Sequence, residues 1–159
     1  MSALEKFPRI TPFLWFDGNA EEAVEFYLGV FKNSRRLDAA RNPGDDARLG
    51  PKGSVVTVAF ELDGQTFTAL NGGPMFKFNE SVSFVVRCDS QAEVDEYWAK
   101  LTAEGGKESQ CGWLNDKFGL SWQVVPARIG ELLTSPKAIQ AMMGMKKLNI
   151  AELERAAEG

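Results

Sequence analysis

Residues 10–31 read ITPFLWFDGNAEEAVEFYLGVF, and residues 80–101 read ESVSFVVRCDSQAEVDEYWAKL. Each stretch starts with a short run of alternating apolar residues, passes through a polar turn, and continues as an amphipathic helix. The strands of the two copies align at an offset of 70 residues and the helices at an offset of 71. Two unrelated strand–helix pairs would give a similar pattern, but the agreement of lengths, caps and helix stripes favours a duplicated βαβββ module.

The first copy predicts a complete module. Asn19 is expected to cap its helix, with Glu22 three residues later in a capping-box arrangement. Asp63-Gly64 is typical of a two-residue hairpin turn. The predicted strands cover residues 10–16, 54–62 and 65–71, and the polar segment 35–50 predicts a weak strand and a loop.

The second copy repeats this plan. Ser90 and Glu93 form a capping box at the start of its helix. A hairpin is expected around residues 117–119. The predicted strands cover residues 81–87, 111–116 and 120–125.

The last part of the chain predicts helices only. Residues 129–133 form a short helical turn, Pro136 begins a segment rich in methionine, and residues 150–157 form a final helix. Methionine clusters can line adaptable binding surfaces, but they more often fill irregular packing. We favour packing, against the body of the protein or a second subunit, for Met142, Met143 and Met145.

Composition excludes some functions. The chain of 159 residues has a net charge of −4 and no concentrated basic surface, which disfavours nucleic-acid binding. It has no apolar leader and no apolar run of membrane-spanning length, so we expect a cytoplasmic protein that does not contact the membrane. Cys88 and Cys111 are expected to be reduced thiols.

The chain contains no histidine, which excludes Ser-His-Asp triads, Cys-His pairs and an imidazole base. Cys111 is a weak candidate nucleophile that Lys117 would activate, but a small buried strand residue is the more ordinary interpretation. Asp116 and Lys117 are expected at a solvated hairpin tip.

Gln123 is the sharpest candidate for a functional side chain, either as a ligand-binding or as a weak catalytic residue. Strand alternation places it with Ser121 and Val125 and opposite Trp122 and Val124. If Trp122 and Val124 pack on the helices, the amide of Gln123 faces a cleft, where it can both donate and accept hydrogen bonds. A buried glutamine satisfied by backbone groups is the alternative.

Aromatic side chains on the strands suggest an apolar pocket. Phe13, Trp15, Phe67 and Trp113 are candidates for its lining, although aromatic residues at strand spacing are often simply core. Asn71, before a Gly-Gly pair, is either a polar group of this pocket or a turn former.

Three segments resemble a known family: PFLWFDGNAEEAVEFY at residues 12–27, CGWLNDKFGLSWQVVP at 111–126 and AMMGMKKLNIAELE at 141–154. They are similar to the PhnB-like proteins of the vicinal-oxygen-chelate (glyoxalase/bleomycin-resistance) superfamily, some of which are labelled 3-demethylubiquinone-9 3-methyltransferase. The resemblance implies an α+β fold of two βαβββ modules, a curved mixed sheet around a cleft, C-terminal helices and a homodimer.

The superfamily's metal enzymes carry ligands on strands that face the cleft. Carried over by position, these ligand sites fall on Thr11, Ser81 and Gln123, which lack charge and imidazole groups and are poor ligands for a divalent metal. We therefore expect no metal and no cofactor. A methyl-donor site of Rossmann type would need a glycine-rich strand-to-helix turn, which the chain lacks.

These interpretations combine into one expected protein. We expect a single domain over residues 1–159, with modules at 8–74 and 78–126 and a helical tail at 127–159. The leading function is metal-free binding of a small molecule. The alternatives are an enzyme on an aromatic or quinone-like substrate (a methyltransferase, or a lyase, isomerase or dioxygenase relative) and a structural dimer with a vestigial cleft. The expected ligand-binding residues are Thr11, Phe13, Trp15, Phe67, Asn71, Ser81, Ser83, Trp113 and Gln123.

Overall fold

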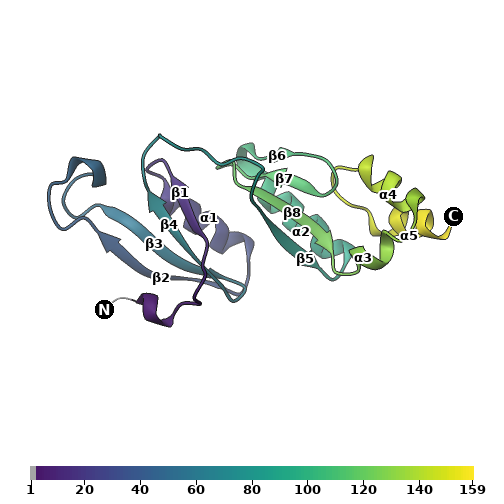
Figure 1. The fold of residues 1–159 in the computed structure, drawn as a ribbon, viewed down its shortest axis with the longest axis horizontal. Helices are drawn as coiled ribbons and strands as arrows, with labels where there is room; N and C mark the ends of the chain where they lie inside the picture. Colours follow the sequence, from purple (N-terminus) through teal and green to yellow (C-terminus); the bar gives the residue numbers. More distant parts are fainter. Residues whose placement is uncertain (1–2) are drawn as a thin grey trace. The chain divides into compact units, whose positions relative to one another are not determined.

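The computed structural model describes residues 3–159, which form two compact units that divide between Lys77 and Phe78. The division falls between the two predicted modules. The first unit contains η1 (Ala3–Lys6), β1 (Phe13–Phe16), α1 (Ala20–Val30), β2 (Ser34–Arg41), η2 (Ala47–Leu49), β3 (Val55–Leu62) and β4 (Gln65–Asn71) (Figure 1). The second unit contains β5 (Ser83–Cys88), α2 (Gln91–Thr102), η3 (Ala103–Gly105), β6 (Lys107–Glu108), β7 (Trp113–Asn115), β8 (Ser121–Pro126), α3 (Ile129–Leu132), α4 (Pro136–Met143) and α5 (Ile150–Glu158).

Both units contain the same βαβββ topology. The strand order is β1-β4-β3-β2 in the first sheet, called sheet A, and β5-β8-β7-β6 in the second, called sheet B. In each sheet the first strand pairs in parallel with the last strand, and the other pairs are antiparallel. The strands β1 and β5 begin 70 residues apart, and the helices α1 and α2 begin 71 apart. The duplicated α+β module predicted from the sequence is therefore confirmed.

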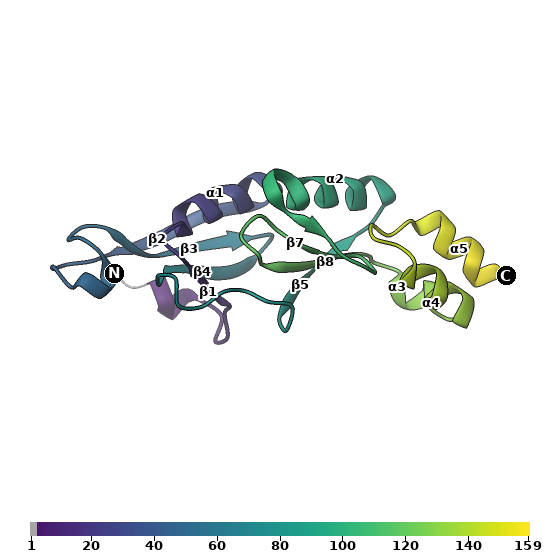
Figure 2. The same ribbon diagram turned by 90° about the horizontal axis from the view of Figure 1, so that it is seen from above.

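Helix α1 covers one face of sheet A, which Figure 2 shows from the side. Tyr27 of α1 stacks on Phe60 of β3 with ring centroids 6.2 Å apart, and Phe60 stacks on Phe67 of β4 at 5.3 Å. Leu14 and Phe16 of β1 are buried on the same face, as strand alternation predicts. We call this the helix face of sheet A and the other side its opposite face.

Helix α2 covers sheet B in the same way. Its buried residues Val94, Trp98 and Leu101 pack with Trp122 and Val124 of β8. The predicted capping box is present, because the Ser90 hydroxyl accepts a hydrogen bond from the Glu93 backbone N–H at 3.2 Å. The helix face and the opposite face of sheet B are defined as in sheet A, and alternation leaves Gln123 on the opposite face.

Several strands differ from the predicted ones. β1 begins at Phe13 instead of residue 10, β5 begins at Ser83 instead of residue 81, and β6 was not predicted. The weak strand expected within residues 35–50 is the eight-residue strand β2, whose side chains are mostly exposed, so it carries no alternating apolar signal. The strand expected at 111–116 begins only at Trp113. Cys111 and Gly112 have φ angles of +60° and +84°, a left-handed conformation that interrupts a strand.

Asp116 is buried, which corrects the expected solvated hairpin tip. One carboxylate oxygen accepts hydrogen bonds from the backbone N–H groups of Phe118 (2.9 Å) and Leu120 (3.1 Å). The other accepts from Nε1 of Trp122 at 2.9 Å. Only 3% of Asp116 is exposed. The carboxylate therefore holds the β7–β8 turn against the core of the second unit.

The C-terminal segment forms a small core of its own. Leu132, Leu148 and Leu153 are buried together, and Met142 and Met145 pack against them. Met143 is exposed, so packing explains two of the three methionines singled out in the sequence. Across residues 3–159, no helix combines the length and apolar character that a membrane span requires.

We predict that Asp116→Ala lowers the free energy of unfolding of the second unit by about 3 kcal/mol, because two backbone N–H groups and the Trp122 indole lose their acceptor. Urea unfolding followed by near-UV circular dichroism measures the change. Lys117→Met is the matched control in the same turn. It removes an ion pair with Glu104 of 3.2 Å but keeps the aliphatic stem, and should cost less than about 1 kcal/mol. Equal losses in the two variants would contradict this role of Asp116.

Candidate functional site

The opposite face of sheet B gathers polar side chains from three strands. β7 contributes Trp113 and Asn115, β8 contributes Ser121 and Gln123, and β5 contributes Ser83. The register pairs Trp113 with Gln123 and Asn115 with Ser121 across the β7–β8 ladder, and Ser83 with Ser121 across the β5–β8 ladder. Paired residues in a sheet share a face. The structure therefore brings together Ser83, Trp113 and Gln123, three of the predicted ligand-binding residues.

Gln123 has one half of its amide engaged and the other half available. Its Nε2 donates to the Ser83 hydroxyl at 3.0 Å. Among residues 3–159, no protein group donates to its Oε1, and every buried side-chain oxygen or nitrogen has a partner. The Oε1 atom is thus accessible and can accept a hydrogen bond from a bound molecule.

A second polar pair lies beside Gln123. Asn115 Nδ2 donates to the Ser121 hydroxyl at 3.0 Å, and Ser121 Oγ donates to the Asn79 carbonyl at 3.4 Å. Ser121 is fully buried, so the loop that precedes β5 closes over this end of the sheet. The sequence prediction did not single out these residues. The signal was present for Ser121, which shares the strand parity of Gln123.

The opposite face of sheet A carries aromatic residues at strand β1. Phe13 is 60% exposed. Trp15 is half-buried, donates from Nε1 to the Gly73 carbonyl at 2.9 Å, and meets the Phe76 ring edge-on with centroids 4.9 Å apart. A Cβ atom at Gly72 would lie 2.4 Å from the Trp15 ring, so only glycine fits beside this indole.

Phe67 does not share a face with Phe13 and Trp15, which corrects its assignment to their aromatic pocket. The parallel register pairs Phe13 with Thr68 and Trp15 with Leu70. Phe67 therefore points to the helix face, where it is 4% exposed. Alternation along one strand cannot show this, because it does not set the register between strands.

Asn71 also lies on the helix face, where it caps α1. Its Oδ1 accepts from the backbone N–H of Ala20 at 2.8 Å, and its Nδ2 donates to the Val55 carbonyl at 3.0 Å. Asn19 occupies the N-cap position, but its side chain makes no capping hydrogen bond. The predicted cap at Asn19 is therefore wrong, and a residue 51 positions further along the chain performs that role.

Thr11 and Ser81 both precede their strands by two residues. Ser81 was expected inside a strand, but β5 begins at Ser83. Both the backbone N–H and the hydroxyl of Ser81 bind Oδ1 of Asn79 in an exposed turn. Ser81 is thus held by the loop and does not lie on the face of sheet B.

Cys111 lies in the turn before β7 and not at a strand start. Its backbone N–H donates to the Met145 carbonyl at 2.8 Å. Lys117, the cation proposed to activate it, follows the other end of β7 and pairs with Glu104 at 3.2 Å. Within the described part of the chain, no three His, Cys, Asp or Glu side chains cluster as a metal site would need.

Comparison with known proteins supports the family resemblance seen in the sequence. The family model described as 3-demethylubiquinone-9 3-methyltransferase matches residues 8–125. A Bacillus cereus structure described as 3-demethylubiquinone-9 3-methyltransferase, PhnB protein, is 34% identical with a TM-score of 0.66, and the match covers 76% of this chain and all of that one. A search of curated protein sequences found no match.

More distant structures share the fold alone. A protein from Pseudomonas aeruginosa is 21% identical with a TM-score of 0.60, over 75% of this chain and 97% of that one. The fosfomycin resistance protein FosX from Mesorhizobium loti is 14% identical with a TM-score of 0.57, over 80% of this chain and 98% of that one.

We predict that Asn71→Ala lowers the free energy of unfolding of the first unit by about 1–2 kcal/mol, because α1 loses its cap and β3 loses a hydrogen bond. Asn19→Ala is the matched control. Its side chain makes no capping bond, so it should change stability by less than about 0.5 kcal/mol. Thermal unfolding of the two variants side by side measures both, and a larger loss in Asn19→Ala would refute the assignment.

Proposed function

Since this chain belongs to the 3-demethylubiquinone-9 3-methyltransferase (PhnB-like) family of the vicinal-oxygen-chelate superfamily, we propose that it binds a small, largely apolar molecule without a metal. The observation that carries the proposal is the available Oε1 atom of Gln123, next to Trp113 on the opposite face of sheet B. Binding sites for small molecules are mostly apolar with a few convergent polar groups. Val125 adds apolar surface to the same face.

The proposed ligand carries a hydrogen-bond donor attached to a flat apolar body. The donor would reach Oε1 of Gln123, and the body would lie on the indole of Trp113. The hydrogen bond that Gln123 Nε2 donates to the Ser83 hydroxyl supports this role, because it fixes the amide nitrogen toward Ser83 and leaves Oε1 available to a ligand.

The proposal that no metal takes part rests on the chemistry of the side chains at the positions where a metal would bind. FosX from Listeria monocytogenes is described as a complex with Mn(II). At the positions where the superfamily resemblance places ligands, this chain has two hydroxyls and an amide, at Thr11, Ser81 and Gln123. The Ser81 hydroxyl is already hydrogen-bonded to Asn79, and Gln123 offers only an uncharged amide oxygen. These groups do not fit a divalent cation, which prefers charged or imidazole ligands.

We predict that 2-naphthol binds the protein and that Gln123→Ala weakens its binding at least about tenfold, which corresponds to loss of about one hydrogen bond. The analogue 2-methoxynaphthalene lacks the donor, so its binding should be the same in both proteins. Ligand-observed NMR titration gives the dissociation constants. Gln110→Ala, an exposed glutamine of the turn before β7, is the control and should change neither.

Three results would refute this proposal. If Gln123→Ala and Gln110→Ala bind 2-naphthol equally, the amide does not serve ligand binding. If neither compound binds, the face has no ligand role, as a structural dimer would predict. Stoichiometric divalent metal in native mass spectra of the purified protein would refute the metal-free part.

An enzymatic role is the second candidate, because the family description is that of a methyltransferase. The turns after β1 and β5 hold a single glycine, Gly18, and not the glycine-rich sequence of a Rossmann-type nucleotide site. Incubation with S-adenosylmethionine and 2-naphthol tests this candidate by mass spectrometry. Methyl transfer that Gln123→Ala abolishes would favour the enzyme over a binding protein.

We also propose a homodimer, on the basis of two unpaired sheet edges. Strands β1 and β5 each end their sheet, and both carry exposed apolar residues, Phe13 and Val85. An edge strand with exposed apolar residues is a surface for association.

We predict a native mass of twice the 17.5 kDa of one chain and, for Val85→Glu, at least about a tenfold increase in the dimer dissociation constant. Val85 is 59% exposed, so the isolated fold should tolerate the change. Lys107→Glu on β6, the other edge of sheet B, is the control. Sedimentation velocity distinguishes the species. A monomeric native protein, or a Val85→Glu variant that dimerises as the native chain does, would contradict the proposed surface.

A further inference from the structure

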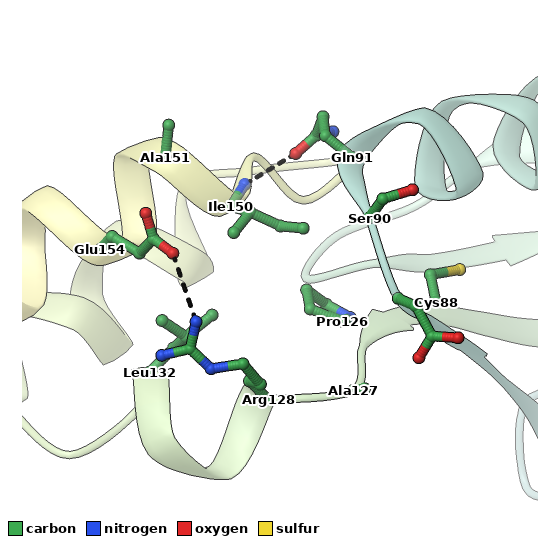
Figure 3. A pocket seen from close by; sticks show the side chains of 11 residues that line it. Cys88, Ser90, Gln91, Pro126, Ala127, Arg128, Leu132, Ile150, Ala151 and Glu154 are labelled. Atoms are coloured by element: carbon green, nitrogen blue, oxygen red, sulfur yellow. Dashed lines mark hydrogen bonds and ion pairs between the residues drawn. The ribbon is translucent and has the colours of Figure 1, made fainter.

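A pocket of about 460 Å³ lies in the second unit, where the carboxyl ends of β5 and β8 meet the helices α3 and α5 (Figure 3). This volume is in the range of sites that hold small organic molecules. Helices α3 and α5 lie beyond residue 125, where the family match ends. The pocket is therefore built in large part by the C-terminal segment, and an inference about it does not rest on the function proposed above.

Hydrogen bonds hold the walls of the pocket in place. Gln91, at the start of α2, donates from Nε2 to the Leu148 carbonyl at 3.0 Å and accepts at Oε1 from the Ile150 backbone N–H at 2.8 Å. The backbone N–H groups of Cys111 and Gly112 donate to the carbonyls of residues 145 and 146, both at 2.8 Å. The segment that leads into α5 is thus fixed at two places, and the pocket is formed without a ligand.

The inner wall of the pocket is apolar. Pro126, Leu132 and Ile150 line it together with two alanines. Cys88 lies at the end of β5, and burial, reinforced by the nearby Glu93 and Asp89 carboxylates, raises the pKa of its thiol to about 12. Its thiol is therefore protonated and uncharged at neutral pH, and it adds apolar surface and no nucleophile.

One cation stands at the edge of this apolar wall. Arg128 donates from Nε to Glu131 at 2.9 Å, but its terminal nitrogen is 3.8 Å from the Glu154 carboxylate, beyond hydrogen-bond distance. Figure 3 shows this loose pair along one side of the pocket, away from Cys88 and Ser90. A carboxylate ligand would replace a long ion pair with short, paired hydrogen bonds to the guanidinium.

The two carboxylates that line the pocket each face an arginine. Glu154 faces Arg128, whose charge it partly balances. Asp89 pairs with Arg87 at 3.4 Å. A bound cation would lie next to the Arg128 guanidinium, which would repel it.

We propose that this pocket binds a small organic acid, with the carboxylate on Arg128 and the apolar body against Pro126, Leu132 and Ile150. The ligand is a monocarboxylate with a short aliphatic or aromatic tail, which matches one guanidinium and one apolar wall. Glu154 competes with the ligand for Arg128, so it lowers the affinity.

Hexanoate, hexan-1-ol and hexylamine test this proposal on the full chain, because they share a tail and differ only in the head group. In isothermal titration hexanoate should bind with a dissociation constant of about 1 mM, and at least about fivefold more tightly than hexan-1-ol. Amide shifts in ¹⁵N spectra should change at Ala127 and Ala151, which line the pocket. Tighter binding of hexan-1-ol or hexylamine, or shifts confined to the opposite face of sheet B, would overturn the proposal.

Three variants and one control locate the interaction. Arg128→Gln should weaken hexanoate about tenfold and leave hexan-1-ol unchanged, whereas Glu154→Gln should strengthen hexanoate. Arg155→Gln, on an exposed position of α5 outside the pocket, should change neither. Ala151→Trp fills the pocket from an exposed helix position and should abolish binding with unfolding temperature retained. Unchanged hexanoate binding in Arg128→Gln or Ala151→Trp would place the acid elsewhere and refute the site.

Discussion

Each sheet in this protein has a single helix packed on it, and one helix can cover only one face of a four-stranded sheet. Because strand side chains alternate between faces, this constraint divides every strand into core residues and residues free for other purposes. Tyr27, Phe60 and Phe67 form the core under α1, and Trp98 with Trp122 forms it under α2. Side chains on the opposite faces are therefore not required for the packing of the helix on the sheet, whereas those on the helix faces are.

The two modules use that freedom differently, although their topology is the same. The opposite face of sheet A carries Phe13 and Trp15, whereas that of sheet B carries the amides of Asn115 and Gln123 with their serine partners. Even the helix caps differ. Ser90 caps α2 from the adjacent position, but α1 is capped from β4 by Asn71. The two modules therefore share their strand topology, while the side chains on their opposite faces and the caps of their helices differ.

Patterns local in sequence were enough to predict most of the fold. Alternation identified β3, β4, β5 and β8, the Asp63-Gly64 turn identified a hairpin, and the offset between the copies showed the duplication. The same reasoning placed Gln123 opposite Trp122. It failed where the deciding contact is remote, as with Phe67, whose face depends on the register of β1 against β4. The role of Asn71 also depends on a remote contact, with a helix start 51 residues earlier in the chain. Asp116 was misjudged for a different reason: its partners are local, but a polar residue in a hairpin normally indicates a solvent-exposed turn.

The pocket under the C-terminal helices shows why a site of this kind has no sequence signature. Its residues come from a strand end at Cys88, a helix start at Gln91, a connection at Arg128 and a final helix at Glu154. None of these positions has a motif, and each has an ordinary explanation on its own. The site exists only because Gln91 uses both ends of its amide to attach a segment 57 to 59 residues away. The Gln91 amide donates to one backbone carbonyl and accepts from one backbone N–H, as a neighbouring strand would. These two bonds hold the start of α5 in place, so that this C-terminal helix forms one wall of the cavity.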